Sequence, residues 1–110
     1  MTFDEYQKQA LTTAIANPDP LMDKTIWVMG IAGEAGEVLE KWKKIVAYRG
    51  GVITEADTAE LAKELGDVVW YIAVLADSLG LSLDDIMQVN VKKLQDRQKR
   101  GVQKGEGDNR

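Results

Sequence analysis

Apolar side chains recur along most of the chain in alternating steps of four and three residues, which is the period of one face of an α-helix. No segment alternates between apolar and polar residues in the way that a half-buried strand does. The pattern predicts four helices, over about residues 3–16, 23–48, 55–79 and 83–100. The apolar lines of the two long helices are Trp27, Ile31, Ala35, Val38, Trp42 and Ile45, then Leu61, Leu65, Val68, Ile72, Leu75 and Leu79.

Capping residues and helix breakers place the ends of these helices. Thr2–Glu5 forms a capping box, and the Asn-Pro-Asp-Pro segment at 17–20 stops the first helix because proline removes a backbone donor. The two glycines at 50–51 end the second helix, while Thr54–Asp57 and Ser82 begin the third and fourth.

Four helices with short connections predict an all-α fold of the four-helix-bundle type, with the two long helices forming an antiparallel hairpin. Residues 1–100 form a single domain in this prediction. The polar, glycine-containing stretch 101–110 is predicted to be disordered.

Composition excludes many kinds of chemistry. The chain has no Cys and no His, so a thiolate nucleophile, a Ser-His-Asp triad and a zinc finger are all absent. The 14 Lys and Arg residues against 18 Asp and Glu give a net charge of −4, which argues against binding to a nucleic acid polymer. No apolar run approaches the length of a membrane span, and we expect a soluble protein of the cytoplasm.

Two segments thirty residues apart repeat the pattern A-x-E-x-G-[E/D]-V. The first carries Glu34 and Glu37, and the second carries Glu64 and Asp67. Residues three apart lie on one helical face, and each acid immediately precedes a residue of the apolar line. We therefore expect both acid pairs to flank the buried stripes, and an antiparallel hairpin to bring all four carboxylates together.

Acid pairs at this spacing are most often exposed surface groups, but the context favours a site. Gly36 and Gly66 stand in the middle of predicted helices, where each costs about 1 kcal/mol relative to Ala, which suggests close approach of a helix or a ligand. Four converging carboxylates repel one another unless cations are present. Oxygen-only ligands without His favour a hard divalent ion, Mg²⁺ or Mn²⁺, over zinc or copper.

These residues also carry a resemblance to a known family. The spacing Glu34-x-x-Glu37 followed by Glu64-x-x-Asp67 resembles the E-x-x-E…E-x-x-D signature of MazG-like all-α nucleoside triphosphate pyrophosphohydrolases. The run from Asn90 to Arg97 is similar to the closing N-x-x-K-L-x-x-R of that family.

The resemblance implies a Mg²⁺-dependent hydrolase that cuts (deoxy)nucleoside triphosphates between the α- and β-phosphates, using a metal-activated water. The four carboxylates would be both the metal ligands and the catalytic groups. The resemblance also implies a homodimer or a dimer of dimers whose helical bundle is completed by a second copy.

Substrate-binding residues are expected on three helices. Asn90, Lys93 and Arg97 share one face of the last helix and are suited to bind phosphate oxygens, although Lys93 and Arg97 also suit a helix C-terminus as ordinary surface cations. Lys41 either reaches a phosphate or pairs with Glu37, which lies four residues before it on the same helix. Tyr71 is a candidate to contact the nucleobase, whereas the three tryptophans are more typical of a core or an interface.

Two other functions remain open at the level of sequence. A non-catalytic helical module that dimerises and binds a partner protein would explain most of the pattern, and a phosphoribosyl-ATP pyrophosphohydrolase-like enzyme would explain the acids as well. A di-iron bundle is disfavoured because that architecture uses His ligands.

Overall fold

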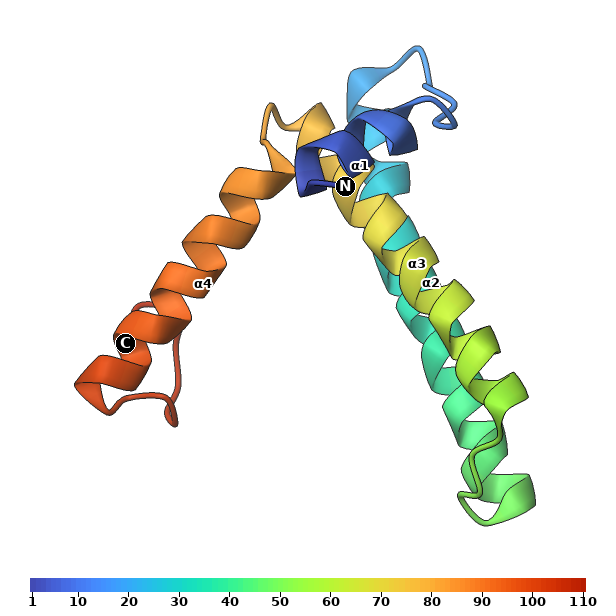
Figure 1. Cartoon of the computed structure of the whole chain (residues 1–110). Coiled ribbons are helices and arrows are strands. Elements are labelled where there is room, and N and C mark those ends of the chain that lie inside the picture. The colour runs from blue at the N-terminus through green and yellow to red at the C-terminus, as the bar shows by residue number, and fades with distance from the viewer.

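The computed structural model describes all residues 1–110 and contains four α-helices and no strands, which confirms the predicted all-α class (Figure 1). The helices are α1 (Phe3–Leu11), α2 (Pro20–Arg49), α3 (Glu55–Ser78) and α4 (Leu83–Arg100). Residues 101–110 contain neither helix nor strand.

Local sequence explains where the helices begin and end. Asp19 caps α2 by accepting a hydrogen bond from the Leu21 amide at 3.0 Å, and Pro20 occupies the first helical position, where its missing N–H costs nothing. Helix α2 therefore begins three residues before the predicted start at 23. Helix α1 ends at Leu11 rather than near 16. At this end the Thr12 hydroxyl donates a hydrogen bond to the Gln9 carbonyl, and such local side-chain bonds compete with continuation of the helix.

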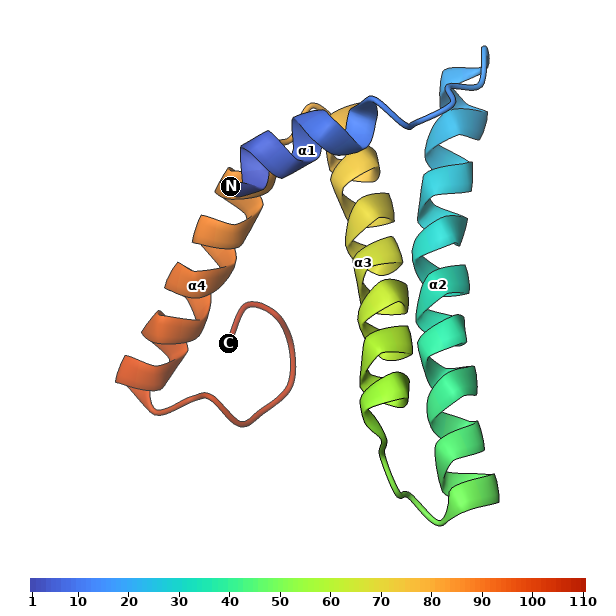
Figure 2. The same cartoon turned by 45° about the vertical axis from the view of Figure 1, so that its right-hand side comes forward.

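Helices α2 and α3 run antiparallel and side by side over most of their length, as predicted (Figure 2). At the connected end of this hairpin, Asp57 completes a capping box with Thr54 and also accepts a hydrogen bond from the Arg49 guanidinium. Arg49 and the Thr54 amide hold the pKa of the Asp57 carboxyl well below its usual range. The ionised carboxylate thus ties the end of α2 to the start of α3.

This contact predicts a pH-dependent contribution to stability. Because the pKa of Asp57 is lower in the folded chain, its contribution is fully present above the ordinary value of 3.8 and is lost as the pH falls below it. Asp57→Asn is expected to lower the melting temperature by several degrees at pH 7, with a smaller difference from the wild type at pH 3. Asp96→Asn, which removes an exposed i,i+4 ion pair with Arg100, is the control and is expected to change the melting temperature little.

Helix α1 lies across the elbow between α3 and α4 and fixes it with hydrogen bonds. The buried Gln7 amide donates to the Ala73 carbonyl at 3.1 Å and the Leu81 carbonyl at 3.0 Å, and its oxygen accepts from the Leu83 amide at 3.1 Å. Asp4 accepts hydrogen bonds from the Ser82 hydroxyl on the same elbow. The core lies directly beneath and consists of Ala10, Trp27, Ala73, Val74 and Leu83.

The four helices do not close into a bundle within one chain. Helix α4 leaves α3 at a bend of 106° and does not touch α2, so the two arms diverge in both views (Figures 1 and 2). The radius of gyration is 17.0 Å, whereas a compact chain of this length has about 13 Å. Only nine of the 110 residues are buried, and many large apolar side chains are exposed.

No single helix is long and apolar enough to cross a membrane; α3 and α4 have the required length and composition only when taken together across their bend.

Candidate active site

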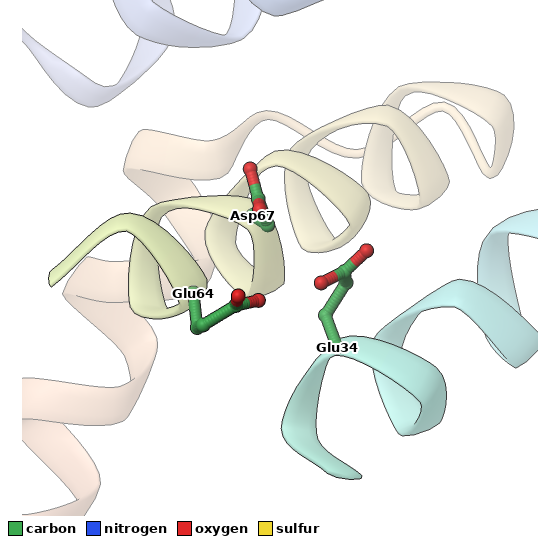
Figure 3. A group of neighbouring side chains, drawn as sticks. All are labelled: Glu34, Glu64 and Asp67. Atoms are coloured by element: carbon green, nitrogen blue, oxygen red, sulfur yellow. The ribbon is translucent and has the colours of Figure 1, made fainter. Parts of the chain in front are cut away.

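Three carboxylates from the hairpin converge on one point. Glu34 projects from α2 toward Glu64 on α3, and Asp67 lies one turn further along α3 (Figure 3). One carboxylate oxygen of each residue lies within 4.8 Å of the corresponding oxygens of the other two. Glu34 and Glu64 are half-buried, and Asp67 is exposed.

Glu34 lies within the packed face of α2 rather than beside it. The least exposed side chains along this stretch of α2 are Trp27, Ile31, Glu34, Val38, Lys41 and Ile45. The predicted apolar line was wrong at Ala35 and Trp42, which are exposed. On α3 the prediction was wrong at Leu65, which is 55% exposed, while the neighbouring Glu64 is half-buried. The hairpin thus packs charged side chains into its own interface.

The electrostatics of this cluster are unfavourable without a cation. Partial burial, contact with Glu64 and the nearby acids raise the pKa of the Glu34 carboxyl. Lys41 supplies a positive charge from further along α2, with its Nζ 3.7 Å from a Glu64 oxygen and 3.5 Å from a Glu60 oxygen. One lysine shared between two glutamates leaves the net charge of the cluster negative.

Glu37 is the one predicted metal ligand that the structure does not bring into the group. Its side chain is exposed, although its charge still contributes to the raised pKa of Glu34. The Glu37–Lys41 pair that the sequence allowed is not formed, because Lys41 points to α3. A Cβ added at Gly36 or at Gly66 would have no neighbour within 4 Å, so nothing within the single chain requires glycine there.

Tyr71 belongs to an aromatic cluster at the top of the hairpin. Its ring centroid lies 5.0 Å from that of Trp70 and 6.2 Å from that of Trp27. A Cβ at Gly30 would lie 2.2 Å from the Tyr71 ring, so glycine at this position is what allows the ring to cross α2. Tyr71 is half-buried and its role toward a nucleobase stays a prediction.

Tyr6 is a neighbour of the site that sequence reasoning missed. It projects from α1, and burial together with the charge of Asp67 raises the pKa of its hydroxyl. Its place on the apolar face of α1 was the only signal in the sequence, and that signal does not distinguish a core tyrosine from one beside the acids.

The predicted phosphate-binding residues lie on the other arm of the molecule. Asn90 is exposed, Lys93 is half-buried and Arg97 is buried, all on α4. Both cations contact Asp108 of the segment 101–110. Because α4 does not touch α2, a single chain does not bring these cations to the acidic cluster.

The donor set of the cluster fits a hard divalent cation. All three groups offer carboxylate oxygens, and the chain has no His or Cys to compete as a ligand. Mg²⁺ binds oxygen at about 2.0–2.1 Å, so ligands on opposite sides of the ion lie about 4.2 Å apart. The oxygens of the cluster lie within 4.8 Å of one another, which is compatible with ligands around one such ion.

Comparison with known proteins identifies the family of the chain. The family model of the MazG nucleotide pyrophosphohydrolase domain matches residues 24–102, which include all three carboxylates and the cations of α4. The chain is 45% identical to the Gene 37 protein of Mycobacterium phage L5 over the full length of both. It is also 50% identical to the Bacillus subtilis (strain 168) protein named "Uncharacterized protein YvdC", but over 38 residues, which are 34% of this chain and 36% of that protein.

No solved structure matches the chain. The family match, which covers well over half of the residues, and the full-length relative together lead to one conclusion: this chain belongs to the MazG nucleotide pyrophosphohydrolase domain family.

Proposed function

We propose that the chain hydrolyses (deoxy)nucleoside triphosphates between the α- and β-phosphates, releasing a nucleoside monophosphate and pyrophosphate. The observation that carries the proposal is the convergence of Glu34, Glu64 and Asp67 at the hairpin interface. The family to which the chain belongs supports the reaction class. We also propose that the enzyme acts in the cytoplasm, where these substrates are made and used.

Mg²⁺, with Mn²⁺ as a substitute, is the cofactor that we propose for these three carboxylates. A divalent cation bound there supplies Lewis-acid polarisation of a phosphoryl oxygen and lowers the pKa of water. The carboxylates would hold the cation at a fixed place between two helices. The bound cation would also offset the repulsion between the acidic cluster and the triphosphate. Glu37, beside the cluster, is proposed as a fourth acid of the same site.

Cationic side chains are proposed to bind the substrate phosphates. Lys41 already lies beside Glu64, so a small movement of its flexible side chain brings it to an anion at the cluster. Asn90, Lys93 and Arg97 are too far away within one chain, so we propose that α4 supplies them to the acidic cluster of a second copy. Tyr71 is proposed to contact the base from the top of the hairpin.

A second copy is also favoured by the surface of α2. One position after its packed line, α2 carries a second apolar line in steps of four and three. Its members are exposed: Val28, Ala32, Ala35, Leu39, Trp42 and Val46. Such a repeated stripe over residues 28–46 of a 30-residue helix is typical of helices that pack against another helix.

The expected oligomer is a dimer or a dimer of dimers. Light scattering at micromolar concentration is expected to give a mass of at least twice the 12.2 kDa of the chain. Leu39→Lys places a charge in the middle of the stripe, where Leu39 is 70% exposed, and is expected to lower that mass. Lys43→Ala, on the charged surface of the same helix, serves as the control. A monomeric wild type would contradict the proposal.

The function is tested by assaying pyrophosphate and orthophosphate separately on a panel of common NTPs and dNTPs and on phosphoribosyl-ATP, with Mg²⁺ and with EDTA. Pyrophosphate is expected as the first product from at least one nucleoside triphosphate, in the presence of Mg²⁺ only. Orthophosphate as the first product would place the attack at the γ-phosphorus and contradict the proposal. No turnover, with no change of melting temperature on adding Mg²⁺, would favour a non-catalytic interaction module.

A further inference from the structure

Lys93 and Arg97, the two predicted phosphate-binding cations of α4, are already paired with an anion from the same chain. Lys93 donates to one carboxylate oxygen of Asp108 at 2.8 Å, and Arg97 donates to that same oxygen at 3.0 Å. Arg97 also donates to the backbone carbonyl of Asp108. A single residue of the segment 101–110 therefore satisfies both charged groups.

This segment is held in a closed loop that sets the position of Asp108. Gly107, immediately before Asp108, has a φ of +84°, a conformation that other residues adopt with strain. The Arg110 guanidinium donates to the carbonyls of Val102, Gln103 and Gly107, which surround it. The loop is thus closed by hydrogen bonds made with its own backbone.

Arg97 and Asp108 differ in burial, and this difference favours replacement of Asp108 by another anion. The Arg97 side chain is only 7% exposed, whereas the Asp108 side chain is 78% exposed. Arg97 lies at the end of α4 that only the segment 101–110 covers (Figures 1 and 2), so this segment buries the cation while its own Asp108 carboxylate stays in contact with solvent. Lys93 and Arg97 hold the pKa of Asp108 below its usual value, so it is charged at neutral pH.

A phosphate presents the same chemistry to these cations as the carboxylate does. Both are oxyanions that accept charge-assisted hydrogen bonds from a guanidinium and an ammonium group. An anion tethered to its site by a short loop acts at an effective concentration of about millimolar or above. A free polyphosphate must therefore displace Asp108 before it binds Lys93 and Arg97.

We propose that Asp108 is a tethered competitor, which occupies the Lys93–Arg97 anion site and weakens its affinity for polyphosphates. The segment 101–110 is then an autoinhibitory strap that opens when a triphosphate or pyrophosphate takes the place of Asp108. The regulatory meaning rests on the proposed function, which assigns these two cations to substrate phosphates.

Binding of inorganic pyrophosphate to the full chain, measured by calorimetry in EDTA, tests the competition directly. Asp108→Asn keeps the size of the side chain but removes its charge, and it is expected to bind pyrophosphate about tenfold more tightly than the wild type. Glu106→Gln is the matched control: Glu106 is an exposed acid of the same segment without an ion pair, and this variant is expected to bind like the wild type. The double variant that combines Asp108→Asn with Arg97→Met is expected to lose this gain in affinity for pyrophosphate.

The opposite outcomes overturn the proposal. Weaker binding by Asp108→Asn would mean that Asp108 positions the two cations for the anion, and equal or undetectable binding by both proteins would mean that no competition exists. Failure of this proposal can be distinguished from failure of the proposed hydrolysis, because pyrophosphate binding in EDTA involves neither the acidic cluster nor turnover. If the chain is an enzyme, Asp108→Asn is also expected to lower KM more than it changes kcat.

Discussion

Replacing Glu64 by Gln is expected to lower the rate of Mg²⁺-dependent pyrophosphate release by about a hundredfold or more. Glu64 lies between its neighbours in the hairpin interface: one of its oxygens is within 4.8 Å of an oxygen of Glu34 and of Asp67, and Lys41 points at it. The amide keeps the shape of the side chain but removes the negative charge that a hard cation requires. The measurement is pyrophosphate release at saturating Mg²⁺, with circular dichroism to establish that the helices are retained.

Glu40→Gln is the matched control for this variant. Glu40 is an exposed glutamate of the hairpin whose partners are the surface residues Lys43 and Lys44. Its loss is expected to change the rate by less than about twofold, because exposed ion pairs contribute little. Comparable activity of Glu64→Gln and the wild type would mean that the acidic cluster takes no part in the reaction.

Gly30→Ala is expected to destabilise the fold by about 1–3 kcal/mol, although Ala is the better helix former. The added Cβ would lie 2.2 Å from two carbon atoms of the Tyr71 ring. That ring packs against Trp27 and Trp70 and has little room to move away. The clash therefore outweighs the gain in helix propensity, which is about 1 kcal/mol.

Gly33→Ala provides the comparison on the same helix. No atom of the chain lies within 4 Å of a Cβ at Gly33, so this variant is expected to keep or raise the free energy of unfolding. Both variants are compared with the wild type by urea denaturation at one protein concentration, because assembly also contributes to apparent stability. Equal stability of Gly30→Ala and Gly33→Ala would show that the aromatic cluster rearranges freely.

Helix type and most helix ends could be predicted from the sequence because they depend on local interactions, although the predicted end of α1 near 16 was wrong. The capping boxes at Thr2 and Thr54 form as predicted, and the glycines at 50 and 101 end α2 and α4 in the left-handed conformation. The start of α2 was predicted too late because the segment 17–20 was interpreted only as the end of the first helix. Asp19 and Pro20 in this segment also begin α2.

The register of the hairpin could not be predicted in the same way. Helix α2 has two adjacent lines of side chains at helical spacing. The line beginning at Val28 is wholly apolar, whereas the one beginning at Trp27 includes Glu34 and Lys41, and periodicity alone does not say which line packs inside the chain. The predicted line mixed the two, and so placed the acids beside the interface. Two contacts between distant elements could not be predicted either: Tyr6 lies near Asp67, and Asp108 pairs with Arg97. Such contacts depend on the path of the chain in space, which the spacing of apolar residues does not reveal. The sequence predicted disorder for 101–110 from its polar, glycine-containing composition, which carries no signal for the hydrogen bonds that Arg110 makes within this segment.

A titration with Mn²⁺ followed by electron paramagnetic resonance shows whether Glu34, Glu64 and Asp67 together bind a divalent cation. The wild type is expected to bind Mn²⁺ and to release it when Mg²⁺ is added, because the site takes either hard ion through oxygen ligands. A double variant, Glu34→Gln with Asp67→Asn, is expected to leave the Mn²⁺ free in solution while remaining folded. Equal Mn²⁺ binding by the wild type and this variant would contradict the account.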